Sequence, residues 1–324
     1  MSVHVLVTGA AGYVGSVLVD ALLRAGHQVR GVDALAHGPA PSLLLAWGED
    51  QFEFVRGDVA DTEAMGSAVE GVDALVHLAA IVGDPACARQ PELARAINVG
   101  ATRELVRAAR ERGVGRFVFA STCSNYGKLD DPNAFATEEW PLRPASLYAE
   151  TKVEAELDVL EQSADGFETC CLRLATVYGV SPRMRFDLTV NEFTRDVLLA
   201  GDLVVYGEQF WRPYVHVRDA AAAVLAVLGA PTEQVAQQVY NVGANKENYR
   251  KLDLVELLRE RIPTAEIQFV KKNEDPRDYR VSFDRIVERL GFRAERTVPD
   301  GIDEVIALLR SGLLDDPYAG VYRN

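Results

Sequence analysis

Two residues that could take a proton from an alcohol stand four positions apart in the run 146–152: Tyr148 and Lys152. On a helix, a spacing of four puts both side chains on one face, one above the other. A phenol beside an ammonium ionises more readily, because the positive charge favours the phenolate. The pair therefore predicts that Tyr148 is a general base whose pKa is lowered by Lys152. A Tyr and a Lys at this spacing also occur on ordinary surface helices, so the interpretation needs support from the surrounding elements.

A glycine-rich turn gives the first support. The apolar run 3–8 is followed by Gly9, Gly12 and Gly15, and then by a segment at 16–23 with helical periodicity. Glycines in a strand-to-helix turn let the backbone approach a pyrophosphate, which is bound by free N–H groups at the positive end of the helix. The spacing Gly-x-x-Gly-x-x-Gly differs from the general Gly-x-Gly-x-x-Gly fingerprint. A glycine triad alone could also be a simple tight turn.

A second predicted strand, at 28–33, ends in Asp33 at the expected distance from the glycines. An acid at this place accepts hydrogen bonds from the adenosine ribose hydroxyls and repels a 2′-phosphate. The sequence therefore predicts NAD rather than NADP as the cofactor. Arg30 precedes the end of the strand and does not change this expectation.

Small hydroxyl side chains follow the predicted strand at 116–120. Because the carboxyl ends of parallel strands face the crevice where ligands bind, Thr122 could hydrogen-bond a reacting oxygen. The segment 121–127 could equally be a Ser/Thr-rich turn, which is common. We expect His77, which precedes a turn of small residues, to be structural rather than catalytic.

Taken in order, these motifs resemble the extended short-chain dehydrogenase/reductase family, and within it the branch of NAD-dependent nucleotide-sugar epimerases and dehydratases. The resemblance runs over nearly the whole chain, and its individual motifs are less specific after residue 173. The segments that carry it are 8–15, 57–59, 77–80, 98–102, 121–127, 148–152, 173–179 and 211–219.

The resemblance implies an NAD site and a catalytic trio. Thr122 would orient the sugar hydroxyl, Tyr148 would take its proton while hydride passes to NAD, and Lys152 would also bind the nicotinamide ribose. Asp58 and Val59 would hold the adenine end of the cofactor. The full cofactor-binding set implied is Gly9, Gly12, Tyr13, Val14, Gly15, Asp33, Asp58, Val59, Leu78, Ala79, Ala80, Asn98, Tyr148 and Lys152.

The residues after Thr122 distinguish between reactions. In the 4,6-dehydratases of this branch, the positions after the catalytic Thr are usually Asp and Glu, which serve as acid and base, but here they are Cys123 and Ser124. A 4-epimerase needs only Thr122, Tyr148, Lys152, NAD and room for the keto sugar to turn over, so C4 epimerisation is favoured. The alternatives are an NAD(P)H-dependent nucleotide-sugar ketoreductase, a 3,5-epimerase using Cys123, a 4,6-dehydratase, and an idle NAD-sensing protein.

The resemblance also implies anion-binding side chains for a nucleotide-diphosphate sugar. Arg212 and Arg280 resemble the family's two pyrophosphate-binding arginines, and guanidinium suits bidentate phosphate recognition. Asn191 falls where the family often contacts the diphosphate, and Arg185 could assist or be a solvated surface charge. Thr176 stands where many relatives carry Asn, which puts the usual sugar contact in question. The expected substrate-binding set is Thr122, Thr176, Arg185, Asn191, Arg212 and Arg280.

Alternating strand and helix patterns up to about residue 172 predict an α/β fold with a Rossmann-type doubly wound parallel sheet. We expect a dinucleotide-binding domain over 1–179, to which 213–243 returns. A smaller mixed α/β substrate lobe would comprise 180–212 and 244–324. The expected helices of the first domain include those near 61–70, 91–112 and 146–164.

The composition limits the partners. The formal net charge of -14 disfavours nucleic acid and anionic membranes, and no apolar run approaches the ~20 residues that span a bilayer. We also expect no signal peptide, because a strand begins almost at once. Apolar stripes on the helices near 91–112 and 146–164 predict a homodimer, since family members pair two such helices with a partner's. A reducing cytoplasm and no bound metal are expected from the spacing of the cysteines, which are Cys87, Cys123, Cys170 and Cys171.

Overall fold

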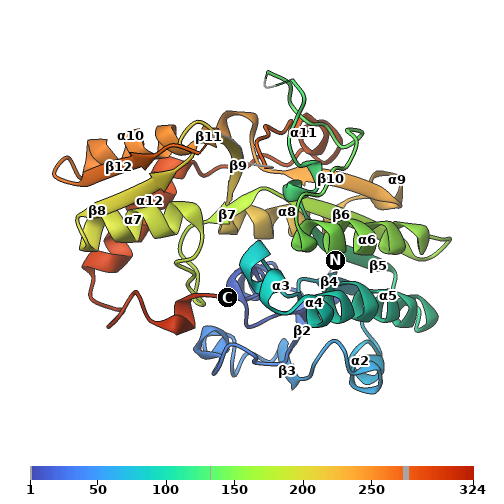
Figure 1. Ribbon diagram of the computed structural model, residues 1–324. Helices are drawn as coiled ribbons and strands as arrows, with labels where there is room; N and C mark the ends of the chain where they lie inside the picture. The colour runs from blue at the N-terminus through green and yellow to red at the C-terminus, as the bar shows by residue number, and fades with distance from the viewer. Residues whose placement is uncertain (1, 132, 273–276) are drawn as a thin grey trace.

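A parallel sheet of seven strands forms the centre of the molecule (Figure 1). The computed structural model describes residues 2–131, 133–272 and 277–324. The strand order is β10-β6-β5-β4-β1-β2-β3, so the chain reverses its direction of winding between β1 and β4, the place where ligands bind in such sheets. The strands are β1 His4–Thr8, β2 Gln28–Asp33, β3 Phe52–Arg56, β4 Ala74–His77, β5 Arg116–Thr122, β6 Glu168–Leu174 and β10 Gln238–Val242.

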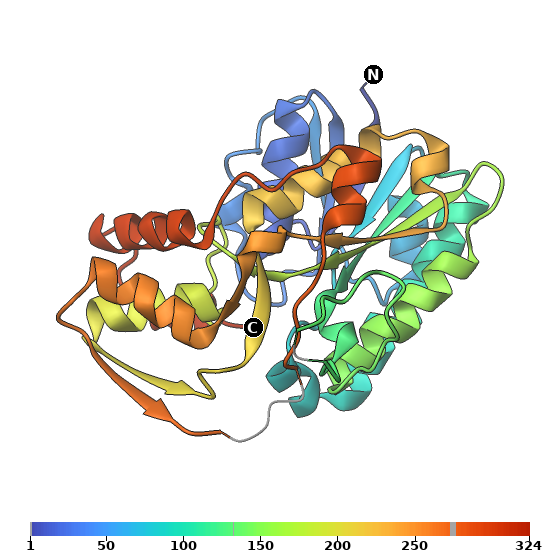
Figure 2. The same cartoon turned by 90° about the horizontal axis from the view of Figure 1, so that it is seen from above.

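Helices cover both faces of this sheet (Figure 2), and the alternation of side chains along each strand explains why. On β1, Val5 and Val7 pack in one apolar cluster with Leu18. Leu6 points the opposite way and packs in a second cluster with Leu105. The first cluster lies under α1 Tyr13–Arg24 and α8 Val217–Gly229, and the second under α2 Thr62–Ala68, α5 Thr102–Glu111 and α6 Leu147–Glu161. The predicted fold class is confirmed.

A smaller lobe, at the upper left of Figure 1, has its own apolar cluster around Tyr178 and Tyr214. Its strands form two small sheets, β11-β9-β7 and β12-β8. The predicted domain boundary at 179 falls just after β7, which pairs with β9 rather than with the central sheet. The division into two domains stays a prediction. The elements of the lobe are β7 Thr176–Tyr178, α7 Thr189–Leu199, β8 Asp202–Tyr206, β9 Trp211–His216, β11 Asn248–Arg250, α10 Lys251–Arg261, β12 Glu266–Val270 and α12 Val298–Arg310.

The helix predicted near 91–112 is divided. It consists of α4 Pro91–Arg95, a π-helical segment Ala96–Ala101, and α5. A π segment inside a helix often marks a functional site, and this one contains Asn98. The remaining helices are α3 Asp84–Arg89, α9 Thr232–Val235 and α11 Asp284–Leu290, with short 3-10 turns at Pro41–Leu43, Cys123–Tyr126, Asn245–Glu247 and Gly320–Tyr322. Within the described residues, no helix is both long and apolar enough to cross a bilayer.

Candidate active site

The glycine turn between β1 and α1 has no room for side chains. Gly9 has φ +72°, and a Cβ added there would lie 2.9 Å from the backbone nitrogen of Ala79. A Cβ at Gly15 would collide with the carbonyl oxygen of Gly9. Helix α1 begins at Tyr13, so its free N–H groups and positive end face this turn, while Val14 packs against apolar residues of the lobe. The turn therefore suits the close approach of a dinucleotide pyrophosphate.

Asp33 fixes the end of β2 against the glycine turn. Its carboxylate accepts hydrogen bonds from the backbone of Ala11 at 3.0 Å and of Leu35 at 2.8 Å. This is the position that recognises the adenosine ribose in such folds. Further along the sheet edge, Asp58 is exposed and accepts from a nearby backbone amide, whereas the side chain of Val59 is buried in the core.

The loop that follows β4, which includes the predicted cofactor contacts 78–80, is held by Asn98. The Asn98 side chain accepts a hydrogen bond from the backbone of Ile81 at 2.8 Å and donates to its carbonyl at 3.0 Å. It also donates to the hydroxyl of Thr151 on α6 at 3.1 Å. Asn98 thus joins this loop to the helix that carries Tyr148.

Thr122, Tyr148 and Lys152 lie together at the carboxyl end of β5. The side chain of Thr122 hydrogen-bonds Tyr148. Lys152 is buried one turn further along α6 and donates to the carbonyl of Ala120 at 2.8 Å. Ser146 caps α6 by accepting from a backbone N–H of its first turn, which starts the helix just before Tyr148. The structure therefore brings the three predicted catalytic residues to one place.

The electrostatics of this trio differ from the expectation. Burial raises the pKa of Tyr148 well above its usual range; among the titratable neighbours, Cys87 and Asp84 raise it further and Arg185 lowers it. Lys152 is not among the groups that dominate this shift. Burial lowers the pKa of Lys152 itself to about 8. The prediction that Lys152 makes the phenol acidic is thus wrong for the protein alone, because desolvation outweighs the neighbouring ammonium.

Neither residue after Thr122 supplies a carboxylate. Cys123 is buried, donates to the carbonyl of Arg173 at 3.1 Å, and has its pKa raised by that burial. Ser124 is half-buried, with its hydroxyl 3.4 Å from the Tyr279 hydroxyl. The Cys123 thiol therefore packs in the core, where a free cysteine behaves as a small hydrophobic residue.

Two predicted binding residues tie the lobe to the glycine turn. Asn191 is fully buried; it accepts from the backbone N–H of Gly179 at 3.0 Å and donates to the Tyr13 hydroxyl at 3.2 Å. Tyr13 in turn donates to the Gly179 carbonyl at 2.6 Å. Arg185 forms a two-bond pair with Asp187, at 2.9 and 2.7 Å. The side chain of Asn191 is thus engaged inside the protein, whereas Arg185 acts electrostatically on both Tyr13 and Tyr148.

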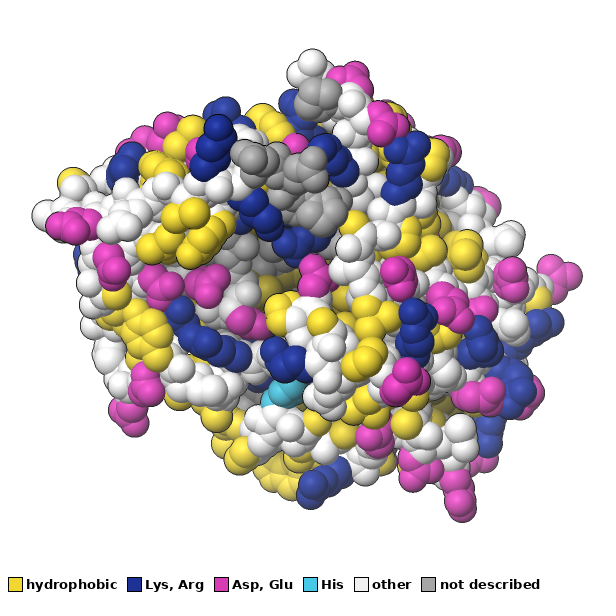
Figure 3. Space-filling model, viewed as in Figure 1, with side chains coloured by type: hydrophobic (Ala, Val, Ile, Leu, Met, Phe, Trp, Pro, Cys, Tyr) yellow, Lys and Arg dark blue, Asp and Glu magenta, His cyan; other side chains and the backbone are white. Residues whose placement is uncertain are grey.

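Arg212 and Thr176 lie on paired strands of the lobe, with Thr176 opposite Tyr214 in the register of β7 and β9. Arg212 is buried, its guanidinium lies over the ring of Tyr279 at 5.6 Å, and it donates to the carbonyl of Arg277. On the face seen in Figure 3, Lys and Arg side chains gather beside a hollow between the lobe and the sheet. The positive side chains beside this hollow are of the kind that bind an anionic ligand.

Arg280 has a different environment. Its guanidinium stacks on the ring of Phe135 at 4.4 Å and on that of Trp211 at 4.9 Å. Trp211 and Arg212 are adjacent on β9, and adjacent strand residues point to opposite faces. Arg280 therefore contacts Trp211, whose side chain points to the opposite face of β9 from that of Arg212.

His77 is a buried structural residue. Its ring nitrogens lie 2.7 Å from the Thr8 hydroxyl and 2.9 Å from the Thr102 hydroxyl. Burial lowers its pKa to about 3, so the ring is neutral at physiological pH. His77 therefore joins β4 to β1 and α5 just before the loop that contains residues 78–80.

Sequence reasoning missed a buried ion pair beneath the trio. Glu156 pairs with Arg173 at 2.5 Å and accepts from the Ser121 hydroxyl at 2.5 Å, and Arg173 donates to the Tyr126 hydroxyl at 2.9 Å. A signal existed, since Glu156 continues the spacing of four from Lys152 and so lies on the same helix face. Breaking such a buried pair typically costs about 3–5 kcal/mol.

Sequence reasoning also missed a pair that crosses from the sheet to the lobe. Asp84, in the first turn of α3, pairs with Arg277 at 2.6 Å. Its other carboxylate oxygen accepts from the hydroxyl of Ser146 at 2.6 Å. No spacing rule relates residues this far apart in the chain, so only the fold reveals the contact.

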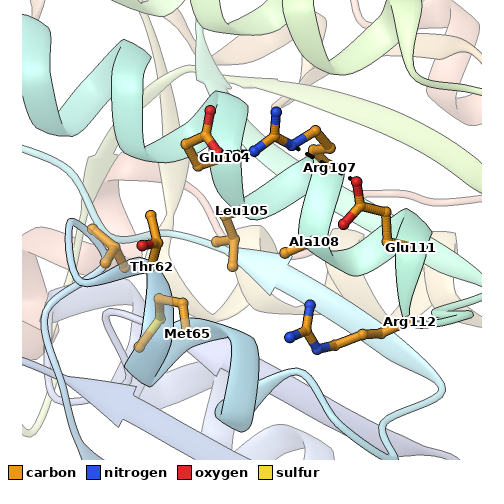
Figure 4. A pocket seen from close by; sticks show the side chains of 9 residues that line it. Thr62, Met65, Glu104, Leu105, Arg107, Ala108, Glu111 and Arg112 are labelled. Carbon is orange, nitrogen blue, oxygen red and sulfur yellow. Dashed lines mark hydrogen bonds and ion pairs between the residues drawn. The ribbon is translucent and has the colours of Figure 1, made fainter.

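A separate cavity of about 140 Å³ lies between α2 and α5 (Figure 4); none of the trio lines it, whereas Val59 of the predicted cofactor set does. Arg107 reaches Glu104 and Glu111 on its own helix, so the charges that line the cavity satisfy one another. Arg112 lies against the position of Gly66 in α2. Among the described residues, no group of His, Cys, Asp and Glu could hold a metal ion.

Comparison with known proteins identifies the family. The model of the NAD dependent epimerase/dehydratase family matches residues 5–243. The chain belongs to this family. The predicted family and the prediction of NAD as cofactor are therefore confirmed, and the glycine turn with Asp33 beside it fits that cofactor.

Relatives of known name carry out more than one reaction. The chain is 32% identical over 314 residues to a UDP-glucose 4-epimerase of Mycolicibacterium smegmatis, covering 94% of this chain and 98% of the relative. It is also 32% identical over 323 residues to a dTDP-glucose 4,6-dehydratase of an Actinoplanes strain, covering 95% and 98%. The solved UDP-glucose 4-epimerase of Thermus thermophilus in complex with NAD superposes with a TM-score of 0.81 at 28% identity, covering 96% of this chain and 100% of that chain. This similarity supports an NAD-dependent nucleotide-sugar epimerase or dehydratase.

Proposed function

We propose that the protein is an NAD-dependent epimerase that acts at C4 of a nucleotide-diphosphate sugar. One observation carries the proposal: Thr122, Tyr148 and Lys152 stand together beside the glycine turn, while the next two positions are a buried Cys123 and Ser124. Water elimination needs an additional acid and base at the sugar, and these positions supply neither. Epimerisation requires only oxidation and re-reduction of the same carbon.

Each residue of the trio has one task. The Thr122 hydroxyl orients the C4 hydroxyl, and Tyr148 takes its proton and later returns it. Bound NAD supplies the hydride acceptor and donor. Lys152 binds the nicotinamide ribose, and it remains protonated below its pKa of about 8. Because burial keeps the Tyr148 phenol neutral in the protein alone, nearby positive charge is needed to favour the phenolate, and Arg185 supplies part of it.

The substrate diphosphate is bound by lobe arginines. Arg212 is held between Tyr279 and the Arg277 carbonyl, which fixes its guanidinium for a bidentate contact. Arg185 adds a positive charge nearer to the sugar, while Arg280 and Thr176 complete the predicted set. The names of the relatives point to UDP- or dTDP-hexoses as the class to test first.

We also propose a cytoplasmic homodimer. Leu93 and Leu157 are exposed on α4 and α6, the helices that the sequence assigns to the dimer. The four cysteines are all free and buried, which suits a reducing compartment. A Leu157→Glu variant should be a monomer by light scattering; a dimer that survives the substitution would contradict this arrangement.

The function is tested by incubating the purified NAD-loaded protein with UDP-glucose, UDP-galactose and dTDP-glucose, and by following the C4 configuration by NMR. The expected result is exchange of configuration at C4 with no net formation of NADH. Formation of a 4-keto-6-deoxy sugar would instead show a dehydratase. Turnover that consumes added NADH or NADPH in stoichiometric amounts would show a ketoreductase.

A further inference from the structure

Asp84 connects three parts of the molecule that take part in the proposed reaction. It belongs to α3, which follows the cofactor loop after β4. One carboxylate oxygen accepts from Ser146, the residue that caps α6 just before Tyr148. The other accepts from the guanidinium of Arg277 at 2.6 Å. A single side chain therefore joins the cofactor loop, the start of the catalytic helix and the lobe.

Arg277 extends this connection to the diphosphate site. Its carbonyl accepts a hydrogen bond from Arg212, the buried arginine proposed to bind phosphate. The adjacent Asp278 also accepts from the backbone N–H of Trp211, which fixes the segment to β9. A ligand that moves Arg212 would therefore also disturb Arg277, the residue that pairs with Asp84.

Asp84 also acts on Tyr148 through its charge. The carboxylate disfavours the phenolate, in the direction opposite to that of Arg185. Tyr148 has several other charged or titratable neighbours. Cys87 on α3 acts on it and Lys152 lies one turn along its own helix, while α6 carries further charges in the buried pair Glu156–Arg173 and the surface pairs Arg95–Glu150 and Arg103–Asp158. Asp84 pairs with Arg277, whose carbonyl in turn accepts a hydrogen bond from Arg212.

We propose that Asp84 is a positioning residue that sets the start of the catalytic helix against the lobe, and that Arg277 compensates its negative charge beside Tyr148. The proposal rests on the proposed role of Tyr148 as the base. It makes the contact between Arg277 and α3 part of the catalytic arrangement. A nucleotide diphosphate bound at Arg212 would be the ligand that stabilises this arrangement.

The two ends of the pair provide a decisive test, because they carry opposite charges. Asp84→Asn keeps an oxygen for Ser146 but removes the negative charge, so Tyr148 should ionise at lower pH. Arg277→Gln leaves the Asp84 carboxylate uncompensated, so Tyr148 should ionise at higher pH. A purely structural bridge predicts the same change for both variants, since each breaks the same contact.

The measurement is a pH titration of tyrosinate absorbance in the NAD-loaded protein, with each background compared with the same background carrying Tyr148→Phe. We expect the Tyr148 midpoint to fall by about half a pH unit in Asp84→Asn, to rise by about half a unit in Arg277→Gln, and to lie near the wild-type value in the double variant. Because the titration does not depend on turnover, it decides the inference even if no C4 exchange is found.

A matched control is Glu139→Gln, which breaks the 2.6 Å pair with Arg285, another contact between distant segments. Its midpoint should equal that of the wild type. Midpoints that move in the same direction in Asp84→Asn and Arg277→Gln, or that stay unchanged in both, would overturn the proposal. The pH at which kcat for C4 exchange falls on the acid side should also be lowest in Asp84→Asn and highest in Arg277→Gln. If the Tyr148 midpoints shift and this pH does not, the proposal is also overturned.

Discussion

The groups at the carboxyl edge of the central sheet and those in the lobe are held by different means. At the sheet edge, the groups proposed to meet a ligand are backbone N–H groups of the glycine turn and two side chains on one capped helix, α6. In the lobe they are arginine side chains held by aromatic rings and backbone carbonyls, such as Arg212 over Tyr279. The sheet edge thus presents groups that the backbone positions, while the lobe presents charged side chains that packing and hydrogen bonds position.

This difference separates two demands of a hydride-transfer enzyme. The cofactor needs one geometry throughout the cycle, which close backbone packing provides. In the proposed epimerisation, the sugar must turn over between oxidation and re-reduction while its diphosphate stays bound, and the lobe guanidinium groups would hold that diphosphate. The substitutions below therefore should affect chemistry and cofactor at the sheet edge, and substrate binding in the lobe.

The largest effect is expected from Tyr148→Phe, which removes the proposed base while keeping the ring. General acid–base catalysis contributes about 10²–10⁴-fold, so kcat should fall by at least about 10²-fold. Bound NAD should still be present, because the glycine turn and Asp33 are intact, although Tyr148 itself belongs to the predicted cofactor set. Kinetics and NAD content are measured together; a variant with near-normal kcat would remove Tyr148 from the mechanism.

Gly15→Ala should abolish cofactor retention. The added methyl would meet the carbonyl oxygen of Gly9, so the turn must open and lose its fit to the pyrophosphate. Gly100→Ala is the matched control, since a Cβ there meets nothing within 4 Å. We expect NAD to be absent from the purified Gly15→Ala protein and present in the control. Equal NAD content in both would show that the turn does not hold the cofactor.

In the lobe, Arg212→Ala should raise KM for the sugar nucleotide by roughly 10–100-fold with a smaller change in kcat. Hydrogen bonds to charged groups contribute about 1.5–3 kcal/mol, which corresponds to this range. Cofactor content should remain that of the wild type. An unchanged KM would exclude a phosphate role for Arg212.

The smallest effect concerns pH. Burial lowers the pKa of Lys152 to about 8, so the ammonium is present below this pH and lost above it. NAD affinity should therefore decline several-fold as pH rises through about 8, and this step should be missing in Lys152→Met. Calorimetric titration of NAD at several pH values measures both; a decline that persists in the variant would assign it to another group.

The sequence predicted which residues meet at the sheet edge, but not their electrostatics, because the rules for the former are local. The glycine spacing, the acid at the end of β2 and the Tyr148–Lys152 spacing each depend on a few consecutive residues. The lobe could not be predicted in the same way. Whether Arg280 faces a ligand or stacks on Phe135 and Trp211 depends on how distant segments pack, and the raised pKa of Tyr148 depends on desolvation that no spacing reveals.

The central claim is that one bound NAD takes hydride from C4 and returns it to the same carbon. The most direct measurement uses UDP-galactose or a dTDP-hexose deuterated at C4 with the NAD-loaded protein and no added cofactor. We expect the C4 epimer to form with its deuterium retained at C4 and with no accumulation of NADH. Loss of the label from C4, or the absence of any C4 epimer with every sugar nucleotide tested, would contradict the claim.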